Sequence, residues 1–202
     1  MPKIKLHRKS TWVDMTAMTD VAFLLLTFLL LTANFIKQEA VVVAAPSSVS
    51  EIKIPETNIL QIIVDTEGKV FIGMDNQEKR IELLDLIANQ YNVSFNDGQK
   101  KEFSLVNSFG VPVEMLQSFL NMPAESRVMK ENALGIPCDS INNQFKEWMR
   151  FARQVNPNLT IAIKADQTTP YPKIKNVMNT LQDLRENRYN LITTLEAMPE
   201  GI

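Results

Sequence analysis

One acidic residue lies at the start of the most apolar stretch of the chain. Asp20 is followed by a run from Val21 to Leu31 in which Thr27 is the only polar residue. Placing a carboxylate at the centre of a bilayer costs about 2.5–3.5 kcal/mol, so an acid kept in such a stretch is a functional candidate by default. A carboxyl group can hold a proton where hydrocarbon encloses it and release that proton where water reaches it. These residue types predict that Asp20 carries protons; the plainer alternative is an acid that pairs passively with a neighbouring helix.

Other polar residues recur at helical spacing around this acid. Thr27 and Asn34 follow it at intervals of seven residues and Thr16 precedes it by four, which places all four on one seam of a helix. Polar groups in hydrocarbon need a partner or a water-lined path, so this seam is expected to face protein. Thr27 and Asn34 are interpreted as packing or interhelical hydrogen-bond residues rather than as part of a path. Asp14, near the helix start, suits a cap-like role as well as a role in proton exit or at an interface.

The element that must position Asp20 is a single transmembrane helix, expected over residues 13–36. From Met15 to Ile36 a helix runs about 33 Å, enough to cross a hydrocarbon core of about 30 Å. The preceding tail, residues 1–12, holds four Lys or Arg residues and no acid within its first nine positions. Basic flanks stay in the cytoplasm, so the residues after Ile36 are expected across the membrane, in the periplasm.

A cleaved signal peptide is the competing interpretation of this N-terminal region. Val43, Ala44 and Ala45 resemble a small-residue processing site at a plausible distance from the basic tail. Pro46 would directly follow the cut, however, and two acids interrupt the region before the apolar run. The apolar run is also longer than the usual 7–15 residues of a signal peptide, which favours an uncleaved anchor.

Composition excludes several other classes of protein. The 202 residues are 45% hydrophobic and 22% charged, which is ordinary for a globular fold. His7 is the only histidine and lies in the basic tail, so the exported part can hold neither a Ser-His-Asp triad nor a His-rich zinc site. Cys138 is the only cysteine, so no intrachain disulfide can form. No glycine-rich phosphate loop is present, and the exported part carries more acids than bases, which disfavours nucleic acid. We expect no enzyme activity, cofactor or metal.

Residues 37–57 are predicted to be an extended periplasmic linker. They show no helical period and contain a Pro-Ser-Ser segment at Pro46–Ser48. Two short strand-like pieces, Val41–Val43 and Ile52–Ile54, could add to the edge of a sheet. The linker is therefore either a plain tether or a segment that docks on the folded domain.

Residues 58–202 are expected to form a small periplasmic domain of the α+β class. Apolar residues alternate at strand spacing in some segments and recur at helical spacing in others. The resulting order, β-β-α-insert-α-β-α-β, predicts a mixed sheet with helices on one face. The insert, about 92–140, contains polar turns and one expected helix. Asp166 follows a strand and is expected to form a turn rather than a binding site. The predicted elements are strands 59–65 and 69–74, helices 78–91, 112–121 and 141–155, a strand 159–165, a helix 172–188 and a strand 190–195.

The N-terminal motif resembles that of the ExbD/TolR family of inner-membrane proton-channel subunits. Over Val13–Val21 the sequence matches the family pattern at the acid, at Thr16 and at the earlier Asn/Asp position. It departs from the pattern at Ala17, where Pro is usual, and at Thr19, where an apolar residue is common. Leu60–Val70 is similar to the first hairpin of that family. Ile161–Asp166 and the helix after it are similar to its strand, Ala-Asp loop and following helix.

The resemblance implies a machine that depends on partner proteins. Family members sit as a pair of single helices in the bilayer, inside a ring of an ExbB/TolQ-like polytopic subunit. Proton flow drives a motion that passes to a TonB-like or TolA-like transducer. The resemblance therefore implies a motor subunit that energises TonB-dependent transport. The alternatives are a TolR-like envelope-integrity subunit, a MotB-like stator subunit, and a membrane-anchored interaction protein without ion flow.

Overall fold

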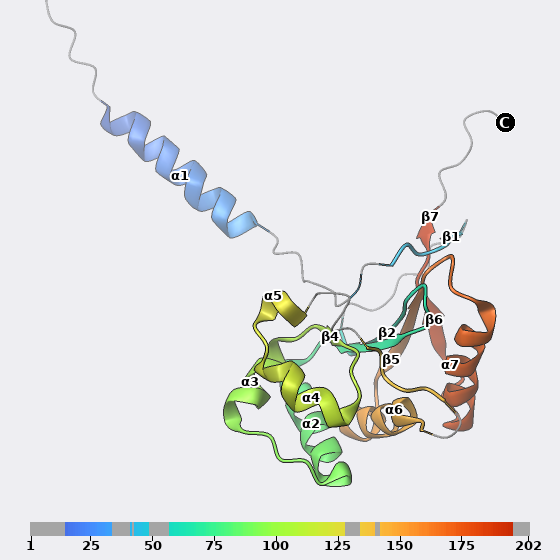
Figure 1. Ribbon diagram of the computed structural model, residues 1–202. Helices are drawn as coiled ribbons and strands as arrows, with labels where there is room; N and C mark the ends of the chain where they lie inside the picture. The colour runs from blue at the N-terminus through green and yellow to red at the C-terminus, as the bar shows by residue number, and fades with distance from the viewer. Residues whose placement is uncertain are drawn as a thin grey trace, which may run out of the picture. The chain divides into compact units, whose positions relative to one another are not determined.

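The computed structural model describes the N-terminal helix and most of the C-terminal domain (Figure 1). The chain divides into two compact units, Met1–Lys37 and Gln38–Ile202. The basic tail, Asp14, Asn34 and the predicted piece Ile52–Ile54 lie outside the described residues. The described residues are 15–33, 41, 43–48, 57–127, 134–139 and 142–195.

The N-terminal unit contains helix α1, Thr16–Thr32. It begins after Met15 without a side-chain cap and without the proline usual in the related motif. It ends earlier than the predicted Ile36, because Ala33 adopts an extended conformation with φ −66° and ψ 113°. Thr32 and the nearby Asn34 are poor residues for a helix interior, which is consistent with an end at this point. Among the described helices, none is both long and apolar enough to cross a membrane. The span predicted over 13–36 stays a prediction.

A five-stranded mixed sheet forms the centre of the domain. The sequence predicted a mixed sheet of four strands, and the fifth comes from the insert. Strand β2, Ile59–Val64, pairs antiparallel with β3, Val70–Met74, and parallel with β5, Thr160–Ala165. Strand β4, Ser108–Phe109, extends the sheet beyond β3, and β6, Tyr189–Leu191, extends it beyond β5. The order across the sheet is β4-β3-β2-β5-β6.

Helices cover one face of this sheet. Every second residue of the central strands, such as Leu60, Ile72 and Ile161, points into the main hydrophobic core, where all three are at most 1% exposed. The same core contains apolar residues of the helices, Leu84 and Trp148 among them. The helices that contribute are α2, Gln77–Tyr91; α3, Asp97–Leu105; α4, Val113–Asn121; α6, Gln144–Val155; and α7, Tyr171–Asp183.

The opposite face of the sheet is covered in part by the segment that precedes the domain. Val41 and Val43 form a second apolar cluster with Ile63 and Phe71, and all four are at most 6% exposed. A few residues further on, β1, Ser47–Ser48, pairs parallel with β7, Thr194–Leu195, near the end of the described chain. We call residues 41 and 43–48 the strap. Of the two alternatives for the linker, this part docks on the domain rather than acting as a plain tether.

The insert is a folded part of the domain. It contains α3, β4, α4 and a short helix α5, Ala124–Arg127, of which the sequence predicted only α4. The rings of Phe103 and Phe109 lie 4.9 Å apart, and Phe109 lies 4.7 Å from Trp148 on α6. The buried Arg80 on α2 donates hydrogen bonds to the carbonyl oxygens of Ser104, at 2.8 Å, and of Val106. These contacts join the insert to the main core.

The remaining predicted elements agree with the structure to within a few residues, except at two helix ends and at the C-terminal strand. The helix predicted over 141–155 begins at Gln144, where the Asn143 side chain accepts the Lys146 N–H and caps the first turn. The helix predicted to reach residue 188 ends at Asp183, because Arg185 takes a left-handed conformation with φ 61°. The single strand predicted over 190–195 is two short ones, β6 and β7.

Candidate functional site

Asp20 is exposed on the surface of α1. None of the residues of this helix is buried. Thr16 stands one turn before Asp20 and Thr27 two turns after it, so three members of the predicted seam share one side of the helix. The Thr27 hydroxyl donates to the Leu24 carbonyl at 2.9 Å. That bond satisfies its donor inside the helix and leaves the hydroxyl oxygen to accept from a neighbour.

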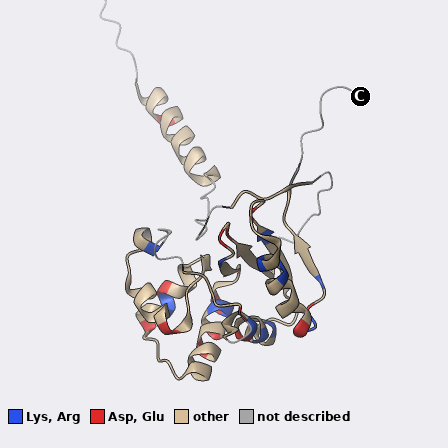
Figure 2. Cartoon of the chain, turned by 45° about the vertical axis from the view of Figure 1, so that its right-hand side comes forward, with Lys and Arg blue, Asp and Glu red and all other residues tan. Residues whose placement is uncertain are grey.

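The surface around this seam is strongly apolar. Figure 2 shows α1 almost without charge, whereas acidic and basic residues are spread over the domain. Phe23, Leu24 and Leu31, which flank Asp20 and Thr27 on the seam, are between 64% and 87% exposed. A contiguous apolar surface of this kind marks an interaction with protein or membrane. The exposed acid thus lies on a surface of the kind that contacts another protein or a membrane.

A second polar centre lies where the strap meets the domain, at Asp166. One carboxylate oxygen accepts from the backbone N–H of Thr168 at 2.9 Å and from its hydroxyl at 2.7 Å. The other accepts from the N–H of Ala44 at 2.9 Å, and the Gln167 N–H donates to the Ala44 carbonyl at 3.0 Å. These hydrogen bonds, those from Thr168 first, lower the pKa of Asp166 below its ordinary value. Asp166 therefore forms the turn expected from the sequence and also holds the strap.

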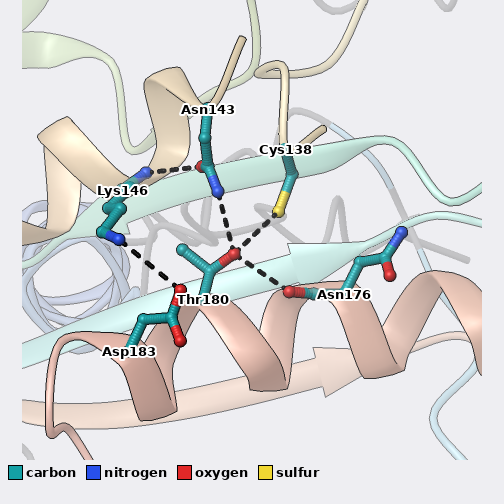
Figure 3. Close-up of polar contacts among 6 residues, drawn as sticks. All are labelled: Cys138, Asn143, Lys146, Asn176, Thr180 and Asp183. Carbon is teal, nitrogen blue, oxygen red and sulfur yellow. Dashed lines mark hydrogen bonds and ion pairs between the residues drawn. The ribbon is translucent and has the colours of Figure 1, made fainter. Parts of the chain in front are cut away.

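A third polar cluster is centred on Thr180 of α7 (Figure 3). Its hydroxyl donates to the Asn176 carbonyl at 3.0 Å and accepts from the Asn143 amide, also at 3.0 Å. Cys138 lies 3.7 Å from the same hydroxyl, and burial raises the pKa of its thiol. A protonated, half-buried thiol is a poor nucleophile, so the cluster offers no covalent chemistry. Among the described residues, no group of His, Cys, Asp and Glu could hold a metal ion.

A family comparison covers nearly the whole chain. Residues 7–196 match the family described as biopolymer transport protein ExbD/TolR. The chain belongs to the ExbD/TolR family. The match includes α1 with Asp20, the strap and the domain with its insert, so all three centres described above fall within it. No curated protein and no solved structure matched the chain.

Family membership indicates a subunit of biopolymer transport that works with polytopic ExbB/TolQ-type subunits. Proteins of this family are transport or accessory subunits, anchored in the inner membrane with a periplasmic domain, and are not known as enzymes. Sequence reasoning predicted Asp20, Thr16 and Thr27 as candidate site residues, which stays a prediction, and it missed the strap-holding role of Asp166. The short run of valines, Val41–Val43, was the available signal for docking, while the partner of the strap, more than 120 residues away in sequence, carried none.

Proposed function

We propose that this chain is the single-helix subunit of an inner-membrane motor that is driven by the proton-motive force and energises TonB-dependent transport across the outer membrane. Asp20 carries the protons, and Thr16, Thr27 and Asn34 line the same seam. Asp14 lies at the cytoplasmic mouth. The observation that carries the proposal is a lone acid, exposed on an apolar helix, in a chain that belongs to the ExbD/TolR family.

The energetics of one acid per helix are adequate for this task. A proton that moves down a potential of 100 mV releases about 2.3 kcal/mol. Placing an ionised Asp at mid-membrane costs about 2.5–3.5 kcal/mol on insertion scales. Because the two energies are similar, passage of a proton can switch the carboxyl between an enclosed neutral form and an ionised form that faces polar groups of a partner. The polytopic subunit forms a ring that supplies these groups, and a second copy of this chain completes the pair of helices within it.

The strap supplies a mechanical link in this proposal. Residues between α1 and the domain must transmit any motion of the helix, and part of that connection is fixed to the sheet by Val41, Val43 and the bonds of Asp166. The effective tether would become shorter when the strap docks and longer when it releases. A TonB-like or TolA-like transducer in the periplasm would receive the motion.

The test is the substitution Asp20→Asn, which keeps the size and polarity of the side chain and removes its ability to release a proton. We expect the variant to insert and to assemble with the polytopic subunit, while energised uptake is lost. Asp97→Asn, on the exposed first turn of α3, is the matched control and should leave uptake unchanged. Normal uptake by Asp20→Asn at native expression would sink the proton-carrier proposal.

The alternatives make different predictions for the same pair of variants. A TolR-like subunit would lose outer-membrane integrity rather than uptake when Asp20 is replaced, and a MotB-like stator subunit would lose motility. A membrane-anchored interaction protein without ion flow would keep its function in both variants. Topology is tested separately: a periplasmic reporter fused after Ile202 and a cytoplasmic reporter at the N-terminus should both be active.

A further inference from the structure

A hollow of about 710 Å³ lies where the chain leaves α7 and enters β6. Its lining comes from two segments, 157–160 and 185–190, together with Arg153 of α6. The first segment leads into β5 and the second into β6, and these two strands are parallel neighbours. The hollow therefore lies between two loops that enter the same edge of the sheet.

The charged side chains that line this hollow are three arginines and one glutamate. Both carboxylate oxygens of Glu186 accept from Arg153, whose Nε and Nη2 donate at 2.7 and 2.6 Å. The Nη1 atom of Arg153 donates to the carbonyl oxygens of Pro157 and Leu159 at 2.8 and 2.9 Å. Arg153 and Glu186 thus neutralise each other, and Glu186 has no oxygen left for another cation.

Arg185 and Arg188 carry the charge that is left. Both side chains are exposed, and neither guanidinium forms a hydrogen bond or ion pair with any residue that the structure describes. The hollow therefore has an excess of two positive charges, although the whole chain has a net charge of −2. A guanidinium group presents its N–H donors in a fixed fork that fits two oxygens of a phosphate or a carboxylate.

The backbone of Arg185 is strained, with φ 61°, at the position after the helix cap where glycine is usual. The helix end is complete without the arginine side chain, because the N–H groups of Arg185 and Glu186 donate to the carbonyl oxygens of Gln182 and Leu181, both at 2.9 Å. A cation also suits the C-terminal end of a helix dipole, but a basic residue in the last turn would supply it without strain, and α7 has none there. Strained residues of this kind concentrate at ligand clamps, which indicates a use for the Arg185 side chain in binding.

We propose that this hollow binds a phosphate ester whose phosphate group is held by Arg185 and Arg188. A phosphate monoester carries a charge of about −1.5 to −2 at pH 7, which two uncompensated arginines match. The exposed amides of Asn158 and Asn187, in the same lining, can donate to hydroxyl groups of the organic part. A hollow of 710 Å³ falls within the range of ligand pockets, about 300–1,000 Å³, and exceeds what a lone phosphate ion needs. This inference does not depend on proton carriage by Asp20.

The test measures binding of glycerol 3-phosphate to the full chain in a non-ionic detergent by isothermal titration calorimetry. We expect a Kd below about 1 mM, and no binding of glycerol, which lacks the phosphate group. Mixed micelles that contain phosphatidic acid present the same phosphate group on a lipid. Tighter binding to these micelles assigns the site to a lipid headgroup, and equal or weaker binding assigns it to a free ester. Because a basic N-terminal tail also attracts anionic lipid, only the part of the binding that Arg185→Gly removes is compared.

Variants of the protein separate binding from structure. Arg185→Gly and Arg188→Gln should each weaken binding of glycerol 3-phosphate by about 10-fold, the effect of a lost charge-assisted hydrogen bond. Because glycine relieves the strained backbone, Arg185→Gly should also unfold at the same urea concentration as the parent or at a higher one. Lys101→Gln removes an exposed cation from α3 instead and should bind like the parent.

Three results would overturn the proposal. The first is no binding of glycerol 3-phosphate at about 1 mM. The second is a loss of affinity in Lys101→Gln as large as in Arg185→Gly, which would show attraction to positive charge anywhere on the protein. The third is an unchanged affinity in Arg185→Gly with unfolding at a lower urea concentration, which would show that the arginine serves only the end of α7.

Discussion

Truncation of Val43 tests whether the strap is a separable element that can dock and release. Val43 is 6% exposed and packs with Val41 on Ile63 and Phe71, on the sheet face opposite the helices. Val43→Ala removes two methyl groups from this contact and leaves the main core untouched. Because the cluster lies outside that core, the substitution should weaken docking of the strap and leave the stability of the strap-released domain unchanged.

The size of the effect follows from the buried groups. Each buried methyl or methylene group contributes about 0.8 kcal/mol, so two contribute about 1.6 kcal/mol. A change of about 1.4 kcal/mol shifts an equilibrium tenfold, so the released fraction of the strap should rise by roughly 10- to 15-fold. The free energy of global unfolding, measured from the docked state, should fall by the same amount. Strap release should cost less free energy than global unfolding, since local opening does not require the sheet to separate.

Hydrogen exchange of the Gln167 backbone amide reports this equilibrium directly, because that N–H donates to Ala44 of the strap. Its exchange in Val43→Ala should be faster by the same factor, and in both proteins it should be faster than exchange of the central-strand amides, which requires global unfolding. The matched control is Ile62→Val, which trims the main core and should lower the global free energy of unfolding by about 0.5–1.5 kcal/mol. Exchange at Gln167 that is no faster than exchange of the central-strand amides, in the parent and in Val43→Ala alike, would refute the separable strap.

Three further predictions concern the domain. Phe109→Ala should lower the free energy of unfolding of the whole domain by about 3–5 kcal/mol, measured in urea, because its ring is packed into the main core; loss of structure confined to the insert would contradict this. Asp166 has a lowered pKa, so its stabilisation of the strap is present above its ordinary pKa of about 3.9 and is lost as the pH falls through the lowered value; the protection factor of the Gln167 amide, which is corrected for slower intrinsic exchange in acid, should therefore fall in acid in the parent, and Asp166→Asn should abolish that dependence. Arg153→Lys should cost about 1–2 kcal/mol in the same urea experiment, because Arg153 forms a two-pronged pair with Glu186 that lysine cannot reproduce; parental stability would show that the pair contributes nothing.

The order of strands and helices could be predicted because their apolar residues repeat at clear periods. Ile59–Val64 and Thr160–Ala165 alternate or run apolar, and α6 places Phe145, Trp148 and Ala152 on one face. α3 could not be predicted in this way, since it places only Phe103 in the core and is secured by the capping box of Asn96 and Gln99. The attachment of α3 to the main core depends on tertiary contacts, which no local sequence pattern encodes.

The candidate sites also fall into two groups, those that a local sequence pattern reveals and those that form between distant residues. Asp20, Thr16 and Thr27 are visible in sequence because a helical period relates them. The link between Asp166 and Ala44 joins residues far apart in the chain, and the polar cluster at Thr180 brings α7 next to Cys138 and Asn143. Such centres arise from the topology of the sheet and become visible only once the strands are placed.

Proton flux is the most direct measure of proton carriage by Asp20. The chain is purified with its polytopic partner, placed in liposomes that enclose a pH-sensitive dye, and subjected to a potential of known sign. The parent complex should conduct protons, Asp20→Asn should reduce the flux to that of empty liposomes, and Thr19→Val, off the polar seam, should conduct like the parent. Equal flux through the parent and Asp20→Asn would contradict the central claim.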